Sequence, residues 1–348
     1  MKQNQFLRSA SLALFALLAS ATVSHAQLEW RISVKFILGP SGQRPSNSGC
    51  FGDSGAALID NASVISNINY SNELLDRTCR GYRFRLTEIQ NVSGWSGFFS
   101  IAARDAGNKA AVEAVATSNA TTRAQFFWRD NAINVYINNT SSGYCSFPGQ
   151  GNVIFAGSCS YDTLIIHESG HFLSLAHTHD TEQFLNANGT PCDSGCSCAQ
   201  LIGGNDGIND TPLDHECWNR AQIVAGNPGV PAALIDNTWL NIMSYHLPQN
   251  RFTSDQLDLA TDASNNSRIN VASGRTRFVD RNCGAIFPDG SSGCGPFSGP
   301  HRTVGSGVSA ANNGDIVLIR SGTYVEPGTI NKAVTLRATR GSATIGQP

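Results

Sequence analysis

The chain has 348 residues, of which 41% are hydrophobic, so it is long enough to bury a sizeable core and to form two domains. Its net charge of -2 gives no support to a nucleic acid or an anionic membrane as partner, and we expect no nucleic-acid binding. Charged residues make up only 14%, against roughly 25% in a typical soluble domain, a profile that is common in loop-rich extracellular proteins.

The N-terminal segment has the features of an export signal. Lys2 and Arg8 supply a positive region, and residues 10–21 form an apolar run that is too short for a membrane span. The tripeptide SHA at 24–26 is a small-x-small cleavage site. We therefore expect residues 1–26 to be removed and the mature protein to be secreted, with no membrane span. An uncleaved anchor is the alternative.

Ten cysteines fit an oxidising compartment, and an even count in an exported chain indicates disulfides. Cys145 with Cys159, and Cys283 with Cys294, are candidate local bridges, although spacing does not determine the pairing. The alternative is a zinc site built on the cysteine cluster at 192–198, which an oxidising compartment disfavours.

Strand and helix patterns alternate along the first half of the chain. The predicted strands, which are alternating or β-rich, lie at 30–38, 82–88, 133–137 and 152–155. The predicted helices lie within 53–70, at 108–118 and along the run YDTLIIHESGHFLSLAH from Tyr161, where Asp162 or Thr163 can cap the first turn. This alternation favours an α/β (α+β) fold in which a mixed, mainly parallel sheet lies over the last helix.

Residues 273–348 differ in texture from residues 27–272 and are expected to form a linker and a second module. Short β-rich runs at 316–319, 333–337 and 343–345 are punctuated by glycine, and they resemble the first turns of a pectin-lyase-like right-handed parallel β-helix. Because a solenoid needs about three stacked repeats, either the sequence is a fragment or these strands pack against the first domain. A generic β-rich tail is the alternative.

The strongest chemical signal is the run HESGH, which begins at His167. On a helix, the imidazoles of His167 and His171 fall on one face, where both can bind one Zn²⁺. Glu168 can take a proton from zinc-activated water and pass it to the leaving amine. A third ligand is expected at His177, which leaves one coordination position open, as in catalytic zinc sites. His179 is a competing third ligand.

Two further motifs accompany the zinc run. Met243, in the run NIMSY, is the only methionine outside the export signal, and Tyr245 follows it by two residues. Asp206 and Asp210, in the run NDGINDTP, could bind Ca²⁺ together with nearby carbonyl groups. An ordinary turn cluster of asparagine, aspartate and glycine is the alternative reading of that run.

These motifs resemble those of the metzincin clan of zinc peptidases, and within it the pappalysin-like metallopeptidases. The resemblance rests on four runs and covers residues 30–265: HESGHFLSLAH, NDGINDTP, NIMSY and RFTSDQ. It implies a metzincin-type catalytic domain in which Glu168 is the general base and Met243 forms a Met-turn beneath the zinc without being a ligand. The ligands that it implies are His167, His171 and His177.

The resemblance also implies roles for the surroundings of the zinc. Tyr245 would hydrogen-bond the oxyanion or ligate the metal, with a buried aromatic at a turn as the alternative. The strand at 152–155 would be the edge that binds an extended peptide. One position departs from the family pattern HExxHxxGxxH, because Ser174 stands where the family has glycine. A left-handed serine costs about 1–2 kcal/mol, so Ser174 is tolerable there.

The sequence thus predicts a secreted zinc-dependent endopeptidase that acts on protein or peptide substrates. One alternative is a non-catalytic binding or adhesion protein, which predicts a broken zinc run, whereas every ligand and the base are present here. Another is a polysaccharide-active protein, which needs a longer β-helix-like part. His215 and His246 are interpreted as ordinary loop histidines. No pattern predicts an oligomeric state.

Overall fold

The computed structural model describes eight ranges of the chain, namely 28–46, 58–78, 80–141, 143–159, 163–184, 201–282, 300–326 and 329–346. The expected export signal, the bridge between Cys283 and Cys294 and the alternative cysteine zinc site lie outside these residues. No helix among the described residues is long and apolar enough to cross a membrane.

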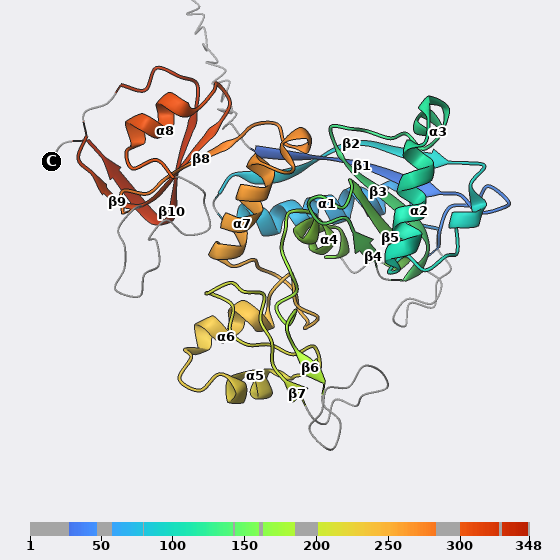
Figure 1. Cartoon of the computed structure of the whole chain (residues 1–348), viewed down its shortest axis with the longest axis horizontal. Helices are drawn as coiled ribbons and strands as arrows, with labels where there is room; N and C mark the ends of the chain where they lie inside the picture. Colours follow the sequence, from blue (N-terminus) through green and yellow to red (C-terminus); the bar gives the residue numbers. More distant parts are fainter. Residues whose placement is uncertain are drawn as a thin grey trace, which may run out of the picture.

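A five-stranded sheet with the order β2-β1-β3-β5-β4 organises the first half of the chain (Figure 1). Its strands are β1 (Leu28–Ile37), β2 (Tyr82–Val92), β3 (Ile133–Ser141), β4 (Gly143–Cys145) and β5 (Val153–Cys159). All neighbouring strands are parallel except β4 and β5, which are antiparallel. The expected mixed, mainly parallel sheet is therefore confirmed.

The edge of this sheet next to the helix that carries His167 and His171 is β4 rather than β5. Ile154 in β5 pairs with Val135 on one side and with Cys145 on the other, so β5 lies inside the sheet. The expectation that residues 152–155 form the peptide-binding edge is therefore wrong. The sequence gives little sign of β4, because a three-residue strand is too short to show an alternating pattern.

Helices cover both faces of the sheet. Four lie in this half of the chain: α1 (Asn61–Asp76), α2 (Ala106–Thr117), α3 (Ala120–Gln125) and α4 (Leu164–Phe172). Val135 packs in one buried cluster with residues of α1 and α4, whereas the next residue, Tyr136, packs in another with residues of α2. This alternation along a strand places α4 beneath the sheet, as expected.

The start of α4 differs in one detail from the expectation. The helix begins after Thr163, but the Thr163 side chain makes no capping hydrogen bond. Its Oγ1 instead donates to Gln249 Oε1 at 2.5 Å, which ties the helix start to the loop that follows the Met243 turn. Asp162, the other candidate cap, lies outside the described residues.

Between α4 and the end of the first domain the chain forms short elements that the sequence analysis does not predict. They are β6 (Gln183–Phe184), β7 (Leu201–Ile202), α5 (Arg220–Gly226), α6 (Ala232–Trp239) and α7 (Ser254–Asn265). Two short 3₁₀ helices, Ser96–Phe98 and Ile269–Val271, complete this part. Helix α7 begins with a capping box, in which Thr253 and Gln256 satisfy each other's backbone N–H groups.

The C-terminal part holds a three-stranded parallel sheet, with the order β10-β9-β8, and one helix (Figure 1). Its elements are β8 (Thr276–Val279), α8 (Val304–Ala310), β9 (Ile316–Tyr324) and β10 (Thr335–Ile345). Phe278, Ile316 and Leu318 belong to the buried cluster that also contains β1 and α4. These strands therefore pack against the first domain, while the β-helix and the domain boundary at 272 stay predictions.

One expected disulfide involves Cys145, which is buried and free in the structure. Cys145 lies opposite Ile154, five residues before Cys159 in β5. Five residues of strand span about 16 Å, whereas a disulfide joins Cα atoms that are at most about 7 Å apart. The expected bridge between Cys145 and Cys159 is therefore wrong.

Candidate metal centre

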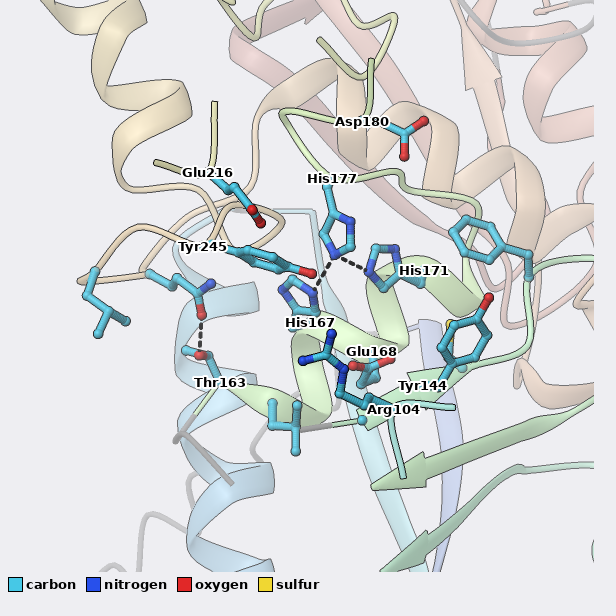
Figure 2. Close-up of a pocket in the computed structure, with 16 residues that line it drawn as sticks. Arg104, Tyr144, Thr163, His167, Glu168, His171, His177, Asp180, Glu216 and Tyr245 are labelled. Carbon is cyan, nitrogen blue, oxygen red and sulfur yellow. Dashed lines mark hydrogen bonds between the residues drawn. The ribbon is translucent and has the colours of Figure 1, made fainter. Parts of the chain in front are cut away.

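Three imidazoles converge in the described structure. His167 and His171 come from consecutive turns of α4, and His177 reaches them from the segment that follows the helix (Figure 2). His177 Nε2 lies 2.9 Å from His171 Nε2 and 3.3 Å from His167 Nε2. The structure thus brings together the three histidines that the sequence predicts as ligands.

Backbone carbonyl groups orient the two helical imidazoles. His167 Nδ1 donates to the carbonyl oxygen of Ile242 at 2.6 Å, and His171 Nδ1 donates to that of Leu175 at 2.6 Å. A carbonyl oxygen can only accept, so each Nδ1 carries the proton and each Nε2 lone pair is free. Lone pairs that meet at one point repel each other unless a cation lies between them. This donor set fits a zinc ion, for which neutral imidazole is a preferred ligand.

The same burial keeps the histidines neutral. It lowers the pKa of His167 to about 4 and that of His171 to about 3, although the carbonyl hydrogen bonds act in the opposite direction. Burial, together with the neighbouring imidazoles, also lowers the pKa of His177. Neutral imidazole is the form that binds a metal, so the site is ready for metal binding at neutral pH.

Ser174 occupies the position where the chain leaves α4 and turns towards His177. Its φ is +76°, in the left-handed region that the family pattern reserves for glycine. Beyond it, Leu175 N donates to the carbonyl oxygen of Gly170 at 3.0 Å, which closes the end of the helix. The turn predicted from the sequence therefore forms with serine in place of glycine.

Glu168 lies in the same cavity as the three histidines and is buried between α4 and β4. Gly143 in β4 approaches it so closely that an added Cβ would lie 3.0 Å from Glu168 Oε1. Burial raises the pKa of Glu168 to about 8, because the carboxylate form is poorly solvated. A carboxyl group in this setting can both accept and return a proton near neutral pH.

Met243 lies beneath α4 and is fully buried. A Cβ at Gly170, between the two helical histidines, would clash with Met243 Sδ, so the methionine packs directly on that part of the helix. Met243 also accepts a hydrogen bond from Thr178 N at 3.2 Å, next to His177. The turn that carries Met243 therefore packs beneath the predicted ligands. The backbone carbonyl group of Ile242, in the same turn, orients the His167 ring.

Tyr245 lies at the rim of the cavity and is 53% exposed. Its ring centroid lies 4.8 Å from that of His177 and 6.3 Å from that of His167 (Figure 2). The alternative of a buried aromatic at a turn does not describe this exposed side chain. Its expected contact with the oxyanion or the metal stays a prediction.

The carboxylates considered for calcium hold a loop in place. Asp206 accepts from Ile208 N and from Thr211 Oγ1, and its other oxygen accepts from Gln256 Nε2 at 3.1 Å. Asp210 accepts from the backbone N–H of Asp255, in the first turn of α7, at 3.1 Å. Neither residue belongs to a group of potential metal ligands in the described part of the chain. Calcium binding at Asp206 and Asp210 therefore stays a prediction.

Asp214 is a buried carboxylate that the sequence analysis does not single out. Its Oδ1 accepts from His246 Nε2 at 2.7 Å, and its Oδ2 accepts from Thr178 Oγ1 at 2.5 Å. Asp214 thus joins the segment of the third histidine to the loop after Met243. Burial alone would raise the pKa of Asp214, but its interactions with His179, His246 and Thr178 lower it. His246 is therefore part of a buried network rather than an ordinary loop histidine, and no spacing in the sequence links these residues.

The cavity is also lined by residues that the sequence analysis does not predict as site residues. They are Arg104, Gly143, Tyr144, Cys145, Phe147, Thr163, Leu164, Asp180, Glu216, Leu247 and Gln249. They come from the start of α4, from β4, and from loops that precede or follow these two elements in the chain. His179, the competing third ligand, stacks on His177 with a centroid distance of 5.0 Å but does not join the three-histidine group.

Comparison with known proteins gives a family match. Residues 121–264 match the peptidase M43 family model, which is described as pregnancy-associated plasma protein-A. This range contains all three histidines, Glu168, Met243 and Tyr245. No curated protein matches the chain.

Solved structures also match the chain, and two of them illustrate the similarity. Mature mirolysin of Tannerella forsythia, in complex with a cleaved peptide, is 16% identical with a TM-score of 0.38, and the match covers 68% of this chain and 91% of mirolysin. A chaperone–substrate complex is 15% identical with a TM-score of 0.28, and the match covers 46% of this chain and 26% of that chain. Both TM-scores are low, so these two structures carry no argument about this chain.

Proposed function

We propose that this chain, whose residues 121–264 are a pappalysin-type metallopeptidase domain, is a secreted zinc endopeptidase that hydrolyses internal peptide bonds of protein substrates. The observation that supports the proposal best is the convergence of three histidine Nε2 atoms in one cavity with the buried carboxyl group of Glu168. Three nitrogen ligands leave room for water or substrate, which is the pattern of catalytic zinc sites.

We assign the zinc to His167, His171 and His177. When bound, zinc acts as a Lewis acid and lowers the pKa of water at the site to about 7. The carbonyl groups of Ile242 and Leu175 hold the two helical rings in the tautomer that presents Nε2. Because these carbonyl groups already hold both rings in place, the two histidines need little rearrangement when they bind the metal.

Glu168 is the general base of the proposed reaction. A carboxylate oxygen accepts a proton from the attacking water, and the resulting carboxylic acid donates that proton to the nitrogen of the leaving amine. Burial favours the protonated state that forms midway, because the neutral acid needs less solvation. Tyr245, at the rim of the cavity, would donate its hydroxyl proton in a hydrogen bond to the oxygen of the scissile carbonyl.

Substrate binds along β4 in this proposal. Among the described residues β4 is an edge strand, with one side on which an extended peptide could pair. Gly143 carries no side chain, so a peptide on β4 can pass close to Glu168. Tyr144 lines the cavity and would contact the substrate beside the scissile bond.

We also propose that the protein is secreted, that it contains disulfides and that it could bind calcium. The apolar run and cleavage site of residues 1–26 would direct secretion. Cys217 is disulfide-bonded, which fits an oxidising compartment. Calcium at Asp206 and Asp210 would add rigidity to a loop that hydrogen bonds already attach to α7.

The substitution Glu168→Gln tests the reaction, because it keeps the size of the side chain and removes its basicity. We expect casein cleavage to fall by roughly 10²–10⁴-fold while the zinc content, measured by mass spectrometry of the metal, stays at the wild-type level. Glu113→Gln is the matched control, since Glu113 is a partly buried glutamate in α2 outside the cavity. Wild-type cleavage by a zinc-loaded Glu168→Gln variant would contradict the mechanism.

A further inference from the structure

A second group of potential metal ligands lies beside the three histidines. One ligand atom from each of His179, Glu182 and Glu216 lies within 4.8 Å of the others. In the described part of the chain, this group and the three histidines are the two sets with that geometry. The proposed peptidase reaction uses none of these three side chains.

His179 is the buried member of the group, with 4% of its surface exposed. Among the described residues its Nδ1 makes no hydrogen bond, and the carboxylate oxygen next to it, Asp214 Oδ2, is 3.8 Å away, which is too long for one. A buried imidazole that lacks full hydrogen bonding is unfavourable for the apo protein. A metal ion bound to one ring nitrogen would give this imidazole a partner, since neutral imidazole is a common metal ligand.

The charges around His179 also favour a cation. Glu182, Asp214 and Glu216 bring three carboxylates to this part of the molecule. The ion pairs that the described residues show for Glu182 and Asp214 are all with histidines, at 3.1 Å for His215 with Glu182 and 2.7 Å for His246 with Asp214. Among the described residues, no lysine or arginine pairs with Glu182 or Asp214, and a divalent cation at this position would balance their charge.

We propose that His179, Glu182 and Glu216 form a second metal site, which binds a divalent transition-metal ion such as Zn²⁺. One imidazole nitrogen and two carboxylate oxygens are a ligand set that zinc accepts. Calcium and magnesium prefer oxygen ligands alone, so the imidazole selects against them. Glu216 is exposed and Glu182 half-buried, which leaves a path for the ion and for water to complete its coordination.

The second site adjoins the first. The rings of His177 and His179 are stacked, with an interplanar angle of 5°, and the ring of Tyr245 contacts both, at centroid distances of 4.8 and 4.7 Å. Glu216 lines the same cavity as His177 and Tyr245, and Figure 2 shows it beside Tyr245. An ion held by Glu216 would therefore sit at the wall of the substrate cavity, and excess zinc should slow peptide cleavage.

Equilibrium dialysis of the mature protein against Zn²⁺ tests the proposal directly. We expect two zinc ions per chain in the wild type, with the second bound more weakly. Glu182→Gln should weaken the second site on the order of tenfold or more and leave the first unchanged. His177→Gln should do the reverse, so that loss of the peptidase site and loss of the second site are read separately.

Asp180→Asn is the matched control, since Asp180 is an exposed carboxylate on the same segment that lines the same cavity but lies outside the second group. This variant should still bind two ions. Glu216→Gln, at an exposed position, repeats the test in case Glu182→Gln folds poorly. A single zinc ion per chain at millimolar Zn²⁺, or two ions with unchanged affinity in both glutamate variants, would overturn the second site. Inhibition of cleavage by excess zinc rests on the proposed function, whereas the zinc count does not.

Discussion

His171 Nδ1 lies 2.6 Å from the carbonyl oxygen of Leu175, across the turn made by the left-handed Ser174. The turn that directs the chain towards His177 therefore also fixes the ring of the second helical histidine. One short segment thus controls two of the three proposed ligands. This dual use explains why the backbone accepts a strained serine there instead of relaxing it.

Replacing Ser174 by glycine should stabilise the protein. The left-handed strain of about 1–2 kcal/mol is relieved, which exceeds the roughly 0.4–1 kcal/mol that glycine adds to unfolded-state entropy. We expect a higher melting temperature in calorimetry and unchanged zinc content. Ser66→Gly, at an exposed helical position of α1, should lower the melting temperature. A lower melting temperature for Ser174→Gly would show that the serine is not strained.

Replacing Gly170 by alanine should destabilise the site, although alanine normally favours a helix by about 0.5–1 kcal/mol. The new Cβ would clash with Met243 Sδ and displace the turn beneath the helix. We expect a lower melting temperature and weaker zinc binding, measured by calorimetry and by dialysis. Gly97→Ala has open space around its new Cβ and should leave both unchanged. An unaffected Gly170→Ala variant would mean that Met243 does not support the helix.

Replacing Asp214 by asparagine should weaken zinc binding at the three histidines, because Asp214 holds the segment of His177 through Thr178. We expect a loss on the order of tenfold in zinc affinity, the usual effect of removing a supporting group. Cleavage should fall at limiting zinc and recover at higher zinc, provided that zinc stays below the level that inhibits the enzyme. Asp280→Asn, which removes another buried, ion-paired carboxylate, controls for stability alone. Equal zinc affinity in both variants would remove Asp214 from the positioning network.

The chelated protein should lose stability on acidification. Unfolded histidine has a pKa of about 6.5, whereas burial lowers the pKa of His167 to about 4 and that of His171 to about 3. Below about pH 6.5 these two histidines therefore bind more protons in the unfolded state than in the folded state, so their contribution to the free energy of unfolding falls until about pH 3–4. Glu168, whose pKa burial raises to about 8, opposes this decline, because its carboxyl group binds its proton more tightly in the folded state.

Melting temperatures of the chelated protein between about pH 7.5 and pH 5 measure this effect, which amounts to about 1 kcal/mol per histidine near pH 5.5. A variant with His167 and His171 both changed to glutamine should show a shallower decline. An identical decline in that variant would assign the effect to other groups.

Three strands and the motif runs of this protein follow from local sequence pattern. The strands at 30–38, 82–88 and 133–137 are confirmed as β1, β2 and β3, because their alternation is written in consecutive residues. The family resemblance of the HESGH, NDGINDTP and NIMSY runs is confirmed by the match over 121–264. By contrast, β4 is too short for any pattern, and it takes the edge position that was expected for β5.

The sequence by itself determined the donor types and the helical spacing of His167 and His171, since one turn of helix places both rings on the same face. Only the tertiary structure decided how those rings are oriented and what lies beside them. Ile242 reaches His167 from 75 residues away, and Asp214 reaches Thr178 from 36 residues away. Contacts of this range depend on how α4, the Met243 turn and the loop at Asp214 pack together, and no short run of residues specifies that packing.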